Sequence, residues 1–136
     1  MQTLTIGIET VLHHAVTEED TACHMGSGSL RVLSTPTVIA WMEGASCTLL
    51  APYLSEDVTT VGTKVDVDHI RATPVGGKVT VKAELTALED RKYTFRVTAE
   101  DQGGIIAQGT HERFAVKTER FLAKTYQQQE AGEAHA

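Results

Sequence analysis

The chain has 136 residues with 12 Lys and Arg against 18 Asp and Glu, so its formal net charge is -6 with histidine neutral. This length corresponds to about one domain, and a composition of 41% hydrophobic and 22% charged residues excludes wholesale disorder. The acidic balance disfavours nucleic-acid binding, which depends on Lys and Arg neutralising phosphates.

Targeting and membrane signals are absent from the sequence. No apolar run approaches the roughly 20 residues that cross a bilayer, and the first ten residues lack the basic and apolar regions of a signal peptide. The two cysteines, Cys23 and Cys47, are too few for a disulfide scaffold or a four-cysteine zinc site. We therefore expect a cytoplasmic protein without membrane or nucleic-acid partners.

Residues 3–16 are expected to contribute one or two strands, and the segment between Thr35 and Pro52 predicts the chain's one long helix. Pro36 suits the first helical position and disfavours helical geometry at the residue before it, so Thr35 is the expected N-cap. Trp41 and Ala40 widen the apolar surface, which predicts that other parts of the protein pack against the helix on more than one side. One arc of this helix is apolar or small, namely Val38, Ile39, Met42, Ala45, Ser46, Leu49 and Leu50.

After the helix the pattern changes to a period of two, which is typical of strands. Four alternating segments are separated by short turns at residues 74–77, 89–90 and 103–104, and they predict an antiparallel meander. In the last segment Gly109 suggests a bulge or a close approach of two backbones. The expected inward residues are Val61, Thr63, Val65, Val67 and His69, then Val79, Val81, Ala83, Leu85 and Ala87, then Tyr93, Phe95, Val97 and Ala99.

The order of elements predicts an α+β fold in which an antiparallel sheet wraps around one central helix. A cystatin-like cone also satisfies this order. Residues 120–128 are expected to form a short terminal helix. We expect residues 1–128 to form a single domain and residues 129–136 to form a disordered tail.

Three polar residues interrupt the apolar pattern. Glu43, at the border of the helical arc, is either a solvated edge residue or a half-buried acid able to accept a proton near neutral pH. His69, on the inward strand face, is either a satisfied core residue or a general acid or base. The Thr35 hydroxyl is explained by capping, yet the same position also favours contact with an oxyanion or thiolate.

Other polar residues carry weaker signals. His13 and His14 are adjacent on a strand and point to opposite faces, so they do not chelate a metal together, and no metal or cofactor is expected. Cys47 is expected to be a packing residue. Along residues 111–113 a histidine, a glutamate and an arginine place opposite charges side by side, and Arg113 is either a surface cation or an anion clamp.

The stretch TPTVIAWMEGASCTLLAPYL, continued by VGTKVDVDHIRATPVGGKVTVKAEL and GTHER, resembles the fluoroacetyl-CoA thioesterases and related acyl-CoA thioesterases of the hotdog fold. The likeness covers about residues 30–125. It implies a hotdog fold and a homodimer, or a tetramer, with active sites at the subunit interface. It also implies a catalytic trio of Thr35, Glu43 and His69, with Gly62 near the acyl group and Arg113 near the active site.

The segment before the catalytic threonine departs from this resemblance. In the fluoroacetyl-CoA enzyme it is longer and carries phenylalanines that form a hydrophobic lid, whereas residues 21–33 here contain glycines and serines but no Phe. We therefore expect this chain to share thioester hydrolysis with the fluoroacetyl-CoA thioesterases. We do not expect it to share their selectivity for the fluorinated acyl group.

Two other functions fit the same sequence. A non-catalytic acyl-CoA binding or sensing module would keep the pocket and Arg113 without needing Glu43 or His69 to exchange protons. A hydratase would use an Asp and a His close together, but Asp68 and His69 are adjacent on a strand and face opposite ways.

Overall fold

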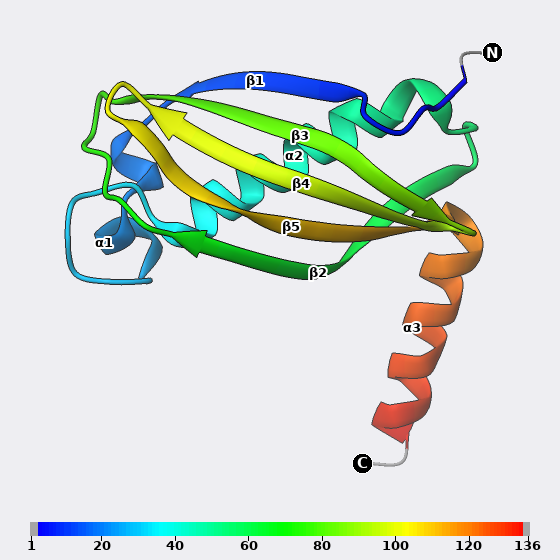
Figure 1. Ribbon diagram of the computed structural model, residues 1–136. Coiled ribbons are helices and arrows are strands. Elements are labelled where there is room, and N and C mark those ends of the chain that lie inside the picture. The colour runs from blue at the N-terminus through cyan, green and yellow to red at the C-terminus, as the bar shows by residue number, and fades with distance from the viewer. Residues whose placement is uncertain (1–2, 135–136) are drawn as a thin grey trace.

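The computed structural model describes residues 3–134 and consists of a five-stranded antiparallel sheet curved around helix α2 (Thr35–Leu50), as Figure 1 shows. The strands are β1 (Glu9–Ala15), β2 (Val58–His69), β3 (Lys78–Glu89), β4 (Lys92–Asp101) and β5 (Gly104–Lys117). The helical turns η1 (Glu18–Asp20), α1 (Ala22–Met25) and η2 (Ala51–Tyr53) flank α2, and α3 (Thr118–Ala134) follows β5. The expected α+β fold is confirmed.

The strand order β1-β3-β4-β5-β2 differs from the expected four-strand meander. Strands β3, β4 and β5 are joined by hairpins as predicted, but β2 pairs with β5 rather than with β3. Residues 70–77 link β2 to β3 past the β4–β5 hairpin, where Ile70 donates its backbone N–H to Ile106. Alternation assigns the face of each residue but not the neighbouring strand, so the four-strand meander was a wrong prediction.

The core lies between α2 and the concave face of the sheet. Most residues of the expected helical arc are buried, and so are the central positions of β3 and β4. Ile39 is only partly buried, and Ala40 is exposed. The buried apolar residues are Val16, Leu33, Val38, Met42, Ala45, Leu49, Leu50, Val79, Val81, Ala83, Leu85, Phe95, Val97, Ala99, Ile106 and Ala107.

Helix α2 begins one residue earlier than predicted. The Ser34 hydroxyl is the N-cap and accepts a hydrogen bond from the Thr37 backbone N–H at 3.2 Å. Thr35 and Pro36 are therefore the first two helical residues, and the expected capping role of Thr35 is wrong. A serine cap is equally favourable, and it leaves the Thr35 hydroxyl available to another partner.

A bulge in β2 changes which residues face α2. The pairing with β5 shifts between Gly62 and Lys64. Beyond the shift, His69 and the preceding alternate residues keep their expected inward positions. Before it, Thr60 and Gly62 face inward, so the expected inward positions of Val61 and Thr63 are wrong. A bulge adds one residue to one strand and reverses the alternation.

Two further expectations concern β5 and the C-terminus. A Cβ at Gly109 would collide with the backbone oxygen of Asp66, so the close approach predicted there is confirmed. Helix α3 is longer than the expected 120–128 segment and continues to Ala134 through most of the expected tail, while residues 135 and 136 lie outside the described part. Within residues 3–134, no helix has the length and hydropathy of a bilayer-spanning segment.

Candidate active site

The first group of site residues joins the start of α2 to the end of β2. Thr35 Oγ1 lies 2.8 Å from Nδ1 of His69. The other ring nitrogen of His69, Nε2, is buried and has no hydrogen-bond partner among the described residues. Burial lowers the pKa of His69, against an opposing effect of the Arg71 backbone. At neutral pH this ring is therefore uncharged and carries an unused polar atom.

The second group contains Glu43 from α2 and Arg113 from β5. Nη1 of Arg113 donates to Oε2 of Glu43 at 3.3 Å. The arginine side chain is only 8% exposed, whereas that of Glu43 is 40% exposed. Glu43 is thus a half-exposed carboxylate with one oxygen against a buried cation. Arg113 is not a surface cation, and the anion that it holds belongs to the same chain.

Arg113 is itself fixed by three further hydrogen bonds. Its Nε donates to Thr60 Oγ1 at 2.9 Å, its Nη2 donates to the Thr60 carbonyl at 3.0 Å, and its Nη1 lies 3.1 Å from His111 Nε2. His111 Nδ1 lies 2.8 Å from the Lys64 carbonyl, which can only accept, so Nδ1 carries the hydrogen and Nε2 accepts from Arg113. Burial, with the positive charge of Arg113, lowers the pKa of His111.

His111 and Thr60 are site residues that the sequence analysis missed. The charges of residues 111–113 are not paired with one another: Glu112 faces the other side of β5, 4.0 Å from Lys92. His111 is 1% exposed and directed inward with Arg113. Alternation along β5 already puts residues 111 and 113 on one face, so the signal for His111 was present. Thr60 could not be found, because the β2 bulge reverses its face.

Gly62 lies directly against Glu43 and Arg113. A Cβ at this position would be 2.7 Å from Glu43 Oε2 and 3.1 Å from Arg113 Nη1. Any side chain at residue 62 would therefore displace the carboxylate or the guanidinium. Glycine also leaves its backbone amide open to close approach by another molecule.

For the thioester hydrolysis that the resemblance implies, the change of Gly62 to Ala is expected to reduce kcat by about tenfold or more. The added methyl moves the Glu43 carboxylate, and a small misplacement of a catalytic group lowers the rate strongly. Thiol release from acetyl-CoA by the purified variant measures the effect, and its melting temperature shows whether it is folded. Gly44→Ala, where a Cβ meets nothing within 4 Å, is the matched control. Equal kcat in the two variants would contradict the close packing at Gly62.

The two groups lie at different points along α2. Thr35 and Glu43 are eight residues apart, or about 12 Å along the helix axis. Among the described residues, the structure brings Thr35 to His69 and brings Glu43 to Gly62 and Arg113, but gives no hydrogen bond between the two groups. A molecule acted on by both groups has to extend along α2 from one to the other.

A cavity adjoins the first group. It has a volume of about 290 Å³ and is bounded on one side by Thr35 and His69. The segment of residues 21–33 contributes the small side chains of Ala22 and Ser27 and the larger ones of Val32 and Leu33. None of the described residues that line this cavity is Phe, Tyr or Trp, so the phenylalanine lid of the resemblance has no counterpart here, and the cavity is open.

The histidine pair on β1 is not arranged to bind a metal. His13 Nδ1 lies 3.2 Å from Thr80 Oγ1, whereas the His14 ring stacks on Trp41 from α2 with 4.3 Å between centroids. The two rings thus lie on opposite faces of the sheet, as expected. No group of three or more metal-binding side chains occurs in the part of the chain that the structure describes.

Comparison with known proteins agrees with this arrangement. Residues 16–119 match the sequence model of the fluoroacetyl-CoA-specific thioesterase family. The fluoroacetyl-CoA thioesterase of Streptantibioticus cattleyicolor is 42% identical over 101 residues, which cover 74% of this chain and 73% of that protein. A solved structure of the fluoroacetyl-CoA thioesterase FlK has a TM-score of 0.88 at 33% identity, covering 93% of this chain and 98% of its own.

A Thermus thermophilus protein described as a thioesterase superfamily member is similar at 26% identity, with a TM-score of 0.89 and coverage of 98% of this chain and 99% of its own. The long central helix and the curved antiparallel sheet are common to these structures. The chain therefore belongs to the fluoroacetyl-CoA-specific thioesterase family and is a thioester hydrolase of the hotdog fold.

Proposed function

We propose that this chain hydrolyses a range of acyl-CoA thioesters to carboxylic acids and free CoA, with Glu43 as the base or nucleophile. The observation that carries this proposal is the half-exposed Glu43 carboxylate, held at one oxygen by the buried Arg113 and lying against Gly62. A fixed carboxylate with one face open to solvent is suited to proton transfer or to attack on a carbonyl.

The chemistry of a thioester makes few further demands. Its thiolate leaves with little protonation, so the site has to activate a nucleophile and stabilise an oxyanion. Glu43 either removes a proton from the attacking water or attacks the carbonyl carbon itself, expelling CoA thiolate and forming an anhydride that water then cleaves. Backbone amides beside Gly62 can approach the carbonyl oxygen, since no Cβ obstructs them.

Thr35 and His69 act at the acyl end of the substrate in this proposal. Nε2 of His69 is buried without a partner among the described residues, and we assign it as the hydrogen-bond partner of a water molecule or a polar atom of the acyl group in the substrate complex. Proton transfer from His69 to the leaving thiolate has to cover the distance between the two groups, through ordered water or across a subunit interface.

We also propose a homodimer with active sites at the interface, in the cytoplasm. Strand β2 is at an edge of the sheet, and both groups of site residues lie beside it. Its inward-facing Val65 is 40% exposed in the single chain. The unpaired backbone groups of a long edge strand and its exposed apolar residues favour pairing with another chain. Light scattering during size-exclusion chromatography tests this assembly, and a monomer at assay concentration would contradict it.

The proposed range of substrates departs from that in the names of the relatives. Because no Phe, Tyr or Trp is among the described residues that line the open cavity beside Thr35 and His69, we expect fluoroacetyl-CoA to be favoured over acetyl-CoA by less than about tenfold in kcat/KM. An open pocket discriminates weakly between groups of similar size. Thiol release from fluoroacetyl-, acetyl-, phenylacetyl- and long-chain acyl-CoA measures this preference. A steep preference for one member would contradict the open pocket.

The same panel separates catalysis from binding alone. Hydrolysis of several members supports the proposed function. Saturable binding of CoA esters without thiol release from any of them would instead favour the acyl-CoA sensing module.

A further inference from the structure

We propose that four basic side chains at the junction of β5 and α3 bind the phosphate groups of the CoA nucleotide. This cationic cluster consists of Arg91, Lys117, Arg120 and Lys124. The inference rests on the proposed function in that it assigns the carrier half of the same substrate. It gives the protein a binding site separate from the groups around Glu43 and Thr35.

The cationic cluster surrounds a cavity of about 160 Å³. The remaining lining residues are Val116 and Phe121, so no acidic side chain lines this cavity. Four of the 12 Lys and Arg meet here in a chain whose formal net charge is -6. Such a local concentration of positive charge attracts an anion against the overall field of the protein.

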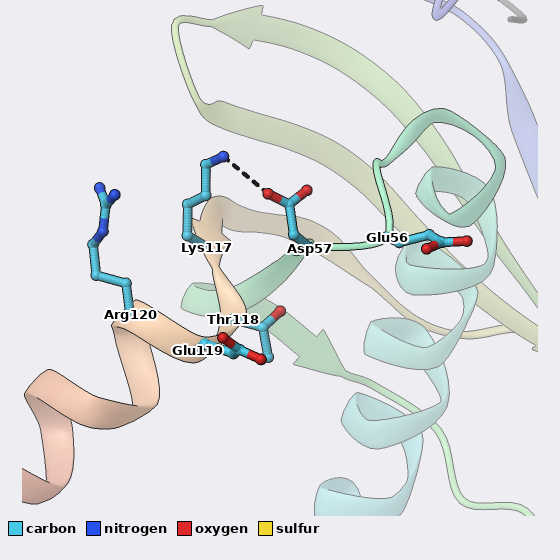
Figure 2. Close-up of a pocket in the computed structure, with 6 residues that line it drawn as sticks. All are labelled: Glu56, Asp57, Lys117, Thr118, Glu119 and Arg120. Atoms are coloured by element: carbon cyan, nitrogen blue, oxygen red, sulfur yellow. Dashed lines mark hydrogen bonds and ion pairs between the residues drawn. The ribbon is translucent and has the colours of Figure 1, made fainter.

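A larger cavity of about 550 Å³ adjoins the cluster and shares Lys117 and Arg120 with it, as Figure 2 shows. Acidic residues also line this second cavity, and Asp57 Oδ2 forms an ion pair with Lys117 Nζ at 2.9 Å. In Figure 2 Arg120 extends from the first turn of α3 without a partner, while Glu119 lies on another side of that turn.

Three charges of the cationic cluster are therefore uncompensated. Among the described side chains, those of residues 3–132, no ion pair joins Arg91, Arg120 or Lys124 to a carboxylate. Arg120 and Lys124 lie one turn apart on the same face of α3, where like charges destabilise a helix. A bound phosphate would relieve this repulsion and form charge-assisted hydrogen bonds with the guanidinium groups.

The distance between the proposed catalytic centre at Glu43 and the cationic cluster suits the length of the CoA molecule. Lys117 follows Arg113 by four residues on β5, which is about 13 Å along a strand. The pantetheine arm has about as many chain bonds between its sulfur and its terminal oxygen as four extended residues do. A thioester carbonyl at Glu43 would thus place the acyl group toward Thr35 and the phosphates at the opposite end of α2, where α3 begins (Figure 1).

Phe121 adds an apolar surface to the cationic cluster. Its side chain is 39% exposed and lines the same cavity as the four basic residues. An exposed aromatic ring beside cations suits an adenine base carried with its phosphates. A cavity of about 160 Å³ has room for phosphate groups beside an exposed ring, whereas the helix of an acidic carrier protein needs a broader surface.

The test compares two substrates with the same reacting group, acetyl-CoA and S-acetylpantetheine, which lacks phosphates. In the double variant Arg120→Gln/Lys124→Gln we expect the KM for acetyl-CoA to rise about tenfold and kcat to stay unchanged. The KM for S-acetylpantetheine should also stay unchanged. The control Lys78→Gln/Arg96→Gln removes the same charge away from the cluster and should leave both KM values unaltered.

Equal changes for the two substrates, or no change for acetyl-CoA, would overturn the site. So would a defect confined to acyl-carrier-protein thioesters. Calorimetric titration with CoA and dephospho-CoA needs no turnover and therefore separates this inference from the proposed function. Wild type should bind CoA about tenfold more tightly than the double variant does, and equal binding would contradict the cluster even if catalysis proceeds normally.

Discussion

Replacing Glu43 by Gln is expected to lower kcat for acyl-CoA hydrolysis by about 100-fold or more while leaving the protein folded. The amide cannot accept a proton or attack a carbonyl at neutral pH, and positioned general bases contribute about 10² to 10⁴ in rate. Glutamine keeps the size of the side chain and an oxygen that can accept from Arg113. Steady-state thiol release, with melting temperature measured in parallel, checks the result.

Glu89→Gln is the matched control for this variant. Glu89 is an exposed residue at the end of β3, away from both groups of site residues, so its change should leave kcat and KM as in wild type. If Glu43→Gln is folded and turns over at a rate close to that of the control, Glu43 is neither the base nor the nucleophile.

The second large effect is expected at His111, which acts as a positioning residue for Arg113. Asparagine can keep the hydrogen bond that Nδ1 donates to the Lys64 carbonyl but loses the acceptor at Nε2. Glutamine can keep an acceptor near Nε2. We expect His111→Asn to lower kcat by about tenfold or more, because a buried guanidinium loses one partner, and His111→Gln to stay close to wild type. Similar losses in both variants would contradict this role.

The pH dependence distinguishes positioning from packing. Protonated His111 cannot accept from Arg113 and repels it, so wild-type activity should fall in acid below the lowered pKa of this ring. His111→Gln has no such group and should keep more of its activity there. Measurement of kcat from pH 5 to 8 in both proteins tests this expectation. The same fall in kcat at acid pH in wild type and His111→Gln would contradict it.

Acid is also expected to lower the stability of the folded protein. Because folding lowers the pKa of His111 below its ordinary value of 6.5, the unfolded chain takes up a proton first as the pH falls. The free energy of unfolding should therefore decrease below about pH 6.5. His14 and His69 contribute in the same direction, so the difference between wild type and His111→Gln isolates the share of His111.

Much of the fold was predictable because its signals are local. The 3.6-residue period identified α2 and most of its buried face, and alternation identified the inward residues of β3 and β4. The position of β2 at the far edge was not predictable, because alternation is the same whichever neighbour a strand has. The bulge after Gly62 was missed although a glycine within a strand favours one, as was inferred for Gly109.

The residues of the candidate site could be selected from the sequence, but most of the contacts among them could not. Sequence reasoning and resemblance selected Glu43, Arg113 and Gly62, which do lie together. The implied trio of Thr35, Glu43 and His69 stays a prediction: within one chain Thr35 contacts His69 at the start of α2, and Glu43 lies two turns further along. The ion pair of Glu43 with a buried arginine depends on Thr60 and His111, which reach Arg113 only through the pairing of β2 with β5.

The most direct test of this account is a crystal structure with an acyl-CoA analogue in which a methylene group replaces the thioester sulfur. If Glu43 acts on the thioester, the ketone oxygen lies within hydrogen-bond distance of a backbone amide near Gly62, and the Glu43 carboxylate faces the carbonyl carbon. The acyl group should extend toward Thr35 and His69. An analogue bound with its carbonyl away from Glu43 would contradict the central claim that this carboxylate acts on the thioester.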